Sequence, residues 1–256
     1  MKNIQIVDEL IEEIGNNKEI VKSFEVRDSL SSDVFKKEDG EFFMHEEIRS
    51  RLLEVTEKFM DYLDIEFFIH DVILTGSLAN YNWSKYSDVD LHILIDYDET
   101  EYNLDLLKGF FDSKRSLWNK QHEITIKGFD CEIYVQDVNE KHHASGIYSI
   151  LNNKWLVTPE KTVQSIDKSL IIKKASEFED RIEDIESKFN GGDDVTDEIK
   201  LLKLKLKKFR QTGLDTGGEF SYENLAFKLL RRNGYIGKLL DVQTKSADKK
   251  LSITQQ

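Results

Sequence analysis

The chain has 256 residues and a formal net charge of −13, and 39% of its residues are hydrophobic. This composition excludes an intrinsically disordered protein, and the length suits one large folded domain or two small ones. The single cysteine, Cys131, excludes an internal disulfide and agrees with a reducing compartment. No apolar run approaches the length of about 18 residues that a membrane span requires, and no export signal is recognisable. We therefore expect a cytoplasmic protein.

The charge is divided unevenly along the chain. Residues 1–150 carry 16 Lys and Arg against 32 Asp and Glu, a net charge of −16, whereas residues 199–256 carry 13 against 5, a net charge of +8. The acidic first half would repel a long nucleic-acid duplex, so a duplex-binding protein is disfavoured. The basic tail leaves room for a smaller anion, such as a nucleoside triphosphate or an RNA end. The same lysines and arginines equally suit the solvated faces of helices.

Apolar spacing predicts the secondary structure of the first 158 residues. The expected elements are a helix at 4–14, a mostly polar loop at 15–40 with room for one helical turn, a helix at 45–63, a strand at 71–75, a helical turn at 78–83, a strand at 89–95, a helix at 103–119, strands at 123–128 and 131–135, and a short strand or turn near 146–150. Gly128 is expected to form a bulge or a hairpin turn. This order predicts a small mixed sheet with helices on one face.

Helical spacing replaces the mixed pattern after Pro159, the only proline. Apolar residues step by four and three over 171–189 and again over 195–209, which predicts an antiparallel helical hairpin. A third helix is expected to begin after an N-cap at Ser221. A short fourth helix is expected over 235–241, followed by a loose final dozen residues.

The most specific pattern lies between the first two strands predicted after residue 70. The strand at 71–75 runs directly into Gly76-Ser77, and after ten more residues Asp88 and Asp90 stand at the start of the next strand. Two carboxylates two positions apart on a strand point to the same side, which suits a divalent cation bound between protein and phosphate. This pattern, together with Glu132 on a later strand, resembles the nucleotidyltransferase superfamily whose namesake is DNA polymerase beta.

The resemblance implies a mechanism with two Mg²⁺ or Mn²⁺ ions. Asp88 and Asp90 would bind the ion on the triphosphate. Asp90 and Glu132 would bind a second ion near the acceptor hydroxyl, whose proton Glu132 would accept. Asp130 lies on the same strand face and is the alternative third carboxylate. The predicted metal and catalytic set is therefore Asp88, Asp90 and Glu132.

The residues predicted to bind the nucleotide are Gly76, Ser77, Lys85, Lys228, Arg231 and Arg232. Gly76 would let backbone N–H groups approach the phosphates, and the Ser77 hydroxyl would hydrogen-bond the terminal phosphate. Lys85 lies between the turn and the acidic pair, where an exposed loop lysine is the other interpretation. The superfamily often uses cations of its C-terminal helices to hold the triphosphate, which implies this role for the last three residues.

Together these patterns predict a mixed α+β protein, with a nucleotidyltransferase-type small mixed β-sheet followed by a C-terminal helical bundle. The expected segments are an N-terminal helix and acidic loop at 1–40, a catalytic core at 41–158 and a helical domain at 159–256. The predicted activity moves an NMP from an NTP, such as ATP, to an acceptor hydroxyl with release of pyrophosphate. The acceptor stays open between a small molecule, a protein, a nucleotide and an RNA end. The alternative is a non-catalytic, antitoxin-like regulatory module on the same fold, which the intact acidic set disfavours.

Overall fold

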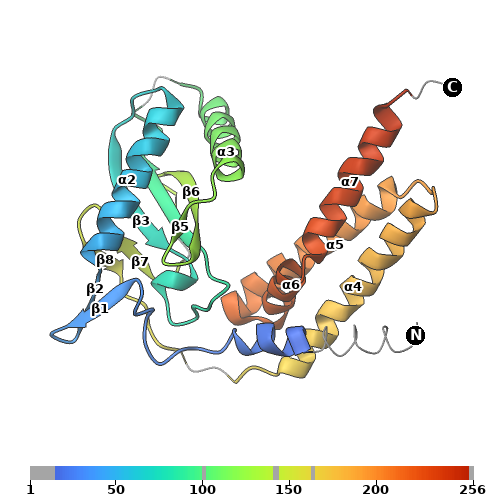
Figure 1. Ribbon diagram of the computed structural model, residues 1–256, viewed down its shortest axis with the longest axis horizontal. Coiled ribbons are helices and arrows are strands. Elements are labelled where there is room, and N and C mark those ends of the chain that lie inside the picture. The colour runs from blue at the N-terminus through green and yellow to red at the C-terminus, as the bar shows by residue number, and fades with distance from the viewer. Residues whose placement is uncertain (1–14, 100–101, 141–143, 163–164, 254–256) are drawn as a thin grey trace. The chain divides into compact units, whose positions relative to one another are not determined.

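The computed structural model describes residues 15–99, 102–140, 144–162 and 165–253. The chain divides into two compact units, one of residues 26–163 and one of residues 1–25 with 164–256. We call the first the sheet unit and the second the helical unit, and each is described by itself (Figure 1). The helix predicted over 4–14 lies outside the described residues.

The sheet unit is built on a six-stranded mixed sheet, which confirms the predicted α+β class (Figure 1). In their order across the sheet, the strands are β5 (Thr125–Ile126), β6 (Phe129–Asp137), β4 (Val89–Ile95), β3 (Ile69–Thr75), β7 (Ile147–Ser149) and β8 (Lys154–Val157). Strands β4 and β6 are parallel, and the other neighbouring strands are antiparallel. A parallel pair needs a crossover connection, which here contains a helix.

That crossover helix, α3 (Leu104–Gln121), packs with α2 (Glu46–Leu63) on one face of the sheet. Strand β4 explains this sidedness, because its residues alternate between the two faces. Leu91 is fully buried in the core shared with both helices. Asp90 and His92 are half-buried and point to the opposite face. The acidic side chain of the central strand therefore lies on the sheet face away from α2 and α3.

Strong apolar periodicity predicted the elements of this unit correctly, and weak periodicity did not. The predicted strand at 89–95 is confirmed residue for residue, and both predicted helices are confirmed within two residues at each end. A hairpin of β1 (Phe35–Glu38) and β2 (Glu41–Met44) overlaps the predicted loop at 15–40, so that prediction is wrong there. Asp39-Gly40 supplies the positive φ values, 49° and 92°, of a two-residue hairpin turn.

The described part of the helical unit contains α4 (Lys168–Asn190), α5 (Thr196–Gly217), α6 (Tyr222–Arg232) and α7 (Tyr235–Leu251), and residues 15–22 are also helical. The two helices of the predicted hairpin are confirmed as α4 and α5. The prediction of a short last helix ending near Asp241 is wrong. Helix α7 continues to Leu251 because Val242 and Ser246 extend its buried stripe at helical spacing. None of the described helices is long and apolar enough to cross a membrane.

Ser221 is confirmed as the N-cap of α6, since its Oγ accepts a hydrogen bond from the backbone N–H of Asn224 at 3.3 Å. We expect Ser221→Ala to lower the free energy of unfolding by about 1 kcal/mol, because it leaves this buried N–H without its partner. Urea denaturation of the full chain measures the change. Ser116→Ala, at an exposed position of α3, is the control, and an equal loss in both variants would contradict the capping role.

Candidate active site

The turn after β3 brings the backbone of Gly76 against the carboxylate of Asp90. Gly76 has a φ of 73° and a ψ of −160°, a conformation that residues with side chains rarely adopt. A Cβ atom built on Gly76 would lie 1.9 Å from Oδ2 of Asp90. The short 3₁₀ turn η1 (Ser77–Ala79) follows directly. Both the backbone conformation and the close contact therefore require glycine, and they fix the turn next to the acid.

Asp90 and Glu132 lie side by side on adjacent strands. They are register partners in the parallel pair of β4 and β6. Because neighbouring strands are about 4.8 Å apart, the two side chains leave the same sheet face a short distance from each other. Asp88 precedes β4 by one residue and is half-buried. Asp130 is exposed and pairs with Thr125 of β5, so the register favours Glu132 as the neighbour of Asp90.

Residues that the sequence analysis missed hold Glu132 in place. The hydroxyl of Tyr134 donates to Oε2 of Glu132 at 2.5 Å. The Tyr134 ring stacks on His92 with 4.9 Å between centroids, and the Arg115 guanidinium lies 4.7 Å from the ring centroid. Burial, and next the hydrogen bond to Glu132, raise the pKa of Tyr134, so the phenol remains a donor at neutral pH. The sequence signal was the period of two along β6, which puts Tyr134 on the face of Glu132.

Helix α3 also fixes the edge of β6 beside these side chains. The Asn119 side-chain amide donates to the backbone carbonyl of Ile133 and accepts from its N–H, both at 3.3 Å. Strand β5 pairs with the first two residues of β6, so further along the strand Asn119 satisfies backbone groups that a neighbouring strand would otherwise pair. The backbone between Glu132 and Tyr134 is thereby held by both α3 and β4.

The charges of Asp90 and Glu132 also act on a side chain at the core side of β6. Burial raises the pKa of the Cys131 thiol to about 12, with contributions from the charges of Asp90 and Glu132. Cys131 is buried in the core, next to Glu132 in sequence. Two carboxylates gathered at one point of a sheet give the negative potential that attracts a divalent cation.

Ser77 and Lys85 both have contacts within the segment that joins the turn to the acidic residues. The Ser77 hydroxyl donates to Oγ of Ser87 at 2.7 Å, and the same Oγ accepts from the backbone N–H of Ser84 at 2.9 Å. Lys85 is exposed, with its ammonium 5.0 Å from the ring centroid of Tyr86. These contacts order the loop before Asp88. Phosphate contacts of Ser77 and Lys85 stay predictions.

The three cationic candidates of the C-terminal region lie on α6, in the helical unit. Burial lowers the pKa of Lys228, and the charges of Arg232, Arg231 and Arg210 lower it further. Arg232 donates to Oγ of Ser23 at 2.7 Å, so it also ties α6 to the N-terminal segment. Positive charge is thus concentrated around α6, and its use for phosphate binding stays a prediction.

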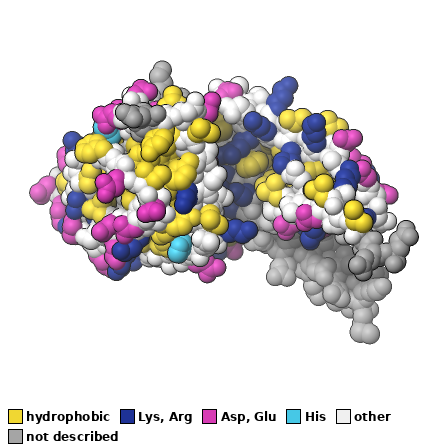
Figure 2. Space-filling model, turned by 90° about the horizontal axis from the view of Figure 1, so that it is seen from above, with side chains coloured by type: hydrophobic (Ala, Val, Ile, Leu, Met, Phe, Trp, Pro, Cys, Tyr) yellow, Lys and Arg dark blue, Asp and Glu magenta, His cyan; other side chains and the backbone are white. Residues whose placement is uncertain are grey.

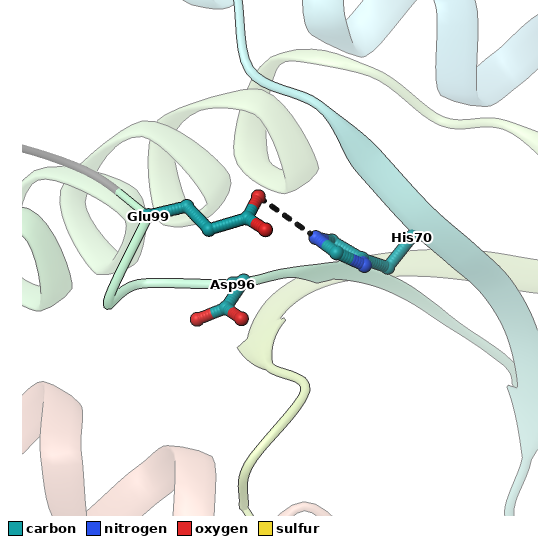
Figure 3. A group of neighbouring side chains, drawn as sticks. All are labelled: His70, Asp96 and Glu99. Carbon is teal, nitrogen blue, oxygen red and sulfur yellow. Dashed lines mark hydrogen bonds and ion pairs between the residues drawn. The ribbon is translucent and has the colours of Figure 1, made fainter.

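Among the described residues, the three metal-ligand side chains whose ligand atoms lie close together are at the other end of β3 and β4, and not at Asp88, Asp90 and Glu132. His70, Asp96 and Glu99 each have a ligand atom within 4.8 Å of the other two, and Nε2 of His70 is 3.2 Å from Oε2 of Glu99 (Figure 3). Along β4, Asp96 stands about 20 Å from Asp90. Asp96 also accepts from the side chain of Asn139 at 3.3 Å. The contact of His70 with Glu99 and the hydrogen bond from Asn139 account for the grouping, so we do not assign the predicted chemistry to it.

We expect Gly76→Ala to reduce the stability of the sheet unit by about 1–3 kcal/mol, because the new Cβ would strain the backbone and collide with Asp90. Any activity that depends on Asp90 should fall with it. Thermal unfolding and activity are both measured. Gly109→Ala is the matched control, since its Cβ would meet no atom within 4 Å and alanine is favoured inside α3. Equal effects of the two substitutions would show that the Gly76–Asp90 contact is unimportant.

Comparison with known proteins adds little to this description of the site. No protein-family model matches the chain, and no curated protein matches it. Among solved structures, a STING-associated CdnE c-di-GMP synthase from Capnocytophaga granulosa is similar at 14% sequence identity and a TM-score of 0.21. The match covers 81% of this chain and 84% of that one. A similarity at this TM-score supports no functional assignment, which must rest on the residues themselves.

Proposed function

We propose that this protein is a metal-dependent nucleotidyltransferase that moves an NMP from an NTP to an acceptor hydroxyl and releases pyrophosphate. The observation that carries the proposal is the register of Asp90 with Glu132, with the backbone of Gly76 against Asp90. Two carboxylates placed on adjacent strands of one half-buried sheet face repel each other when both are charged. A bound cation between the carboxylates and a phosphate chain removes that repulsion.

Asp88, Asp90 and Glu132 are the residues that would hold the ions. They offer only oxygen ligands, which suits Mg²⁺ or Mn²⁺ better than softer metals. Their fit to a cation is supported by the neighbouring positions of Asp90 and Glu132 in the sheet. When bound, such ions polarise phosphate oxygens and lower the pKa of a bound hydroxyl.

The chain's own groups would have separate tasks around the nucleotide. The Gly76-Ser77 turn would present backbone N–H groups to the phosphates, since no Cβ stands in the way at Gly76. Glu132 would accept the proton of the acceptor through Oε1, because its Oε2 already accepts from Tyr134. Lys85 and the cations of α6, which are Lys228, Arg231 and Arg232, would balance the charge of the triphosphate.

A labelling screen over several acceptor classes tests the proposal. Each of the four α-labelled NTPs is incubated with the full chain and Mg²⁺ or Mn²⁺. The acceptor pools are tRNA, total RNA, protein and small metabolites. We expect one NTP to transfer its label to one pool, with equimolar pyrophosphate release that a metal chelator abolishes. Binding of NTP with no pyrophosphate release under any condition would contradict the proposal and favour the non-catalytic binding module.

A further inference from the structure

The helical unit carries a groove between α5 and α7, with a volume of about 680 Å³. The residues that line it are Thr196, Ile199, Lys200, Lys203, Leu204 and Lys207 from α5, and Gln243, Ser246, Ala247, Lys250 and Leu251 from α7. On each helix these positions recur every three or four residues, so they form one stripe per helix. From Thr196 to Lys207 the α5 stripe is about 17 Å long, which is a rod-shaped site.

Several of the apolar side chains that line the groove are open to solvent. Leu204 is 56% exposed and Leu251 is 84% exposed, although both are large aliphatic side chains. Ala247 is small, which leaves the space between the helices unfilled. Apolar side chains that are gathered in one concave strip, rather than scattered singly, indicate a surface that binds something.

Contacts across the groove show that its two walls are fixed to each other. Nζ of Lys203 on α5 donates to Oε1 of Gln243 on α7 at 2.6 Å. At the N-terminal end of α5, Oγ1 of Thr196 lies 3.4 Å from Oγ of Ser246. Binding in the groove would therefore need no rearrangement of α5 against α7, which lowers the entropic cost of association.

The rim of the groove is strongly basic. Four of its lining side chains are lysines, and no acidic side chain is among the described residues that line it. Lys200, Lys203 and Lys207 extend along about 10 Å of α5, whereas Nζ of Lys250 on the α7 side already pairs with Oδ2 of Asp194 at 2.7 Å. Figure 2 shows Lys and Arg side chains among hydrophobic and acidic ones on the face of the helical unit in that view. This charge is local, since the whole chain has a net charge of −13.

We propose that this groove binds an acidic amphipathic helix of a partner protein. The apolar side chains of such a helix, repeated every three or four residues, fit the strip around Leu204 and Ala247. Asp and Glu on its flank would pair with Lys200 and Lys207 of α5. A fatty acid or a lipid carries its charge at one end, whereas the lysines here are spread along the groove, which favours a helix. The proposal does not depend on nucleotidyl transfer.

The test uses a fluorescein-labelled peptide of about 18 residues, long enough to fill the groove as a helix. It carries Leu at helical spacing and Glu on both flanks. Fluorescence anisotropy with the full chain should show saturable binding that weakens as salt rises. A peptide of the same composition with the helical spacing scrambled should bind at least about tenfold more weakly.

Substitutions in the groove test whether the peptide binds there. The double variant Lys200→Glu with Lys207→Glu should lower the affinity for the peptide by at least about tenfold, because it reverses the charge of two groove lysines. Ala247→Trp should lower the affinity by a similar factor, because the indole ring would fill the groove. Lys208→Glu, on α5 but outside the groove lining, should leave binding unchanged. Circular dichroism and thermal unfolding confirm that each variant is folded.

Three results would overturn the proposal. The first is equal binding of the scrambled peptide, and the second is full binding by both the charge-reversed and the Ala247→Trp variants. The third concerns membranes. If vesicles rich in anionic lipid bind the chain and displace the peptide, and binding is lost in the same groove variants, the surface is a lipid-binding one and the helical partner is wrong.

Discussion

Replacement of both Asp88 and Asp90 with alanine is expected to reduce NMP transfer by at least about 10³-fold, because the metal ligands nearest the triphosphate are lost. The fold should survive the change. Asp90 is half-buried at the edge of the Gly76 turn, and removal of two neighbouring negative charges relieves repulsion with Glu132. The measurement is the initial rate of label transfer at saturating Mg²⁺, with thermal unfolding as the check on folding.

The chain offers a matched control for this double variant. Asp96 and Asp98 have the same spacing just beyond the other end of β4, and Asp96 belongs to the group with His70 and Glu99. The double change of Asp96 and Asp98 to alanine should leave the transfer rate within a few-fold of the unaltered protein. If this control abolishes transfer while the Asp88 and Asp90 variant retains it, the metal site has been placed at the wrong end of the sheet.

The substitution Glu132→Gln is expected to reduce the transfer rate by about 10²–10⁴-fold, because an amide cannot accept the proton of the acceptor. Affinity for the NTP should change little, since Asp88 and Asp90 still provide the ligands at the triphosphate. The amide oxygen of glutamine can also accept from Tyr134, so the packing around the site is preserved. Rates and NTP dissociation constants are measured separately, because only their difference identifies a role in the chemical step.

Two further variants make this prediction decisive. Asp130→Asn tests the alternative third carboxylate, and Glu123→Gln is a control at an exposed position before β5. We expect both to retain normal rates. A loss of rate with Asp130→Asn instead of Glu132→Gln would show that the register neighbour of Asp90 is not the catalytic group. If Glu132→Gln lowers the affinity for the NTP without lowering the transfer rate, Glu132 acts in NTP binding and not in the chemical step.

The sequence predicted those parts of the structure in which a single periodicity dominates. Strand β4 alternates between buried aliphatic and polar residues, and α4 and α5 repeat apolar residues at helical spacing, so the side to be buried was clear. The short strand β1 (Phe35–Glu38) offered too few residues for a pattern. Helix α7 was predicted too short, because its polar face after Asp241 hides a stripe that is buried only by packing against its neighbours.

The same limit applies to the candidate site. Asp88, Asp90 and Glu132 stood out because their spacing has a chemical meaning along the chain. The contacts of Tyr134 with Arg115 and Glu132, by contrast, join α3 to β6 and depend on how a helix docks against a strand. Tyr134 has only the period of two along β6 as a local signature, and Arg115 on α3 has none. Groups that orient a functional carboxylate therefore needed the three-dimensional structure.

The crossover through α3 has a consequence for how variants of this protein should be studied. Asp90 and Glu132 become neighbours only when β6 has docked in parallel beside β4, and pairing between such distant segments is slow because a long loop must close first. A nick or an insertion that stops this docking removes the acidic pair and the cohesion of the sheet in one event. Loss of turnover is informative about chemistry only when the folded fraction of each variant has been matched first.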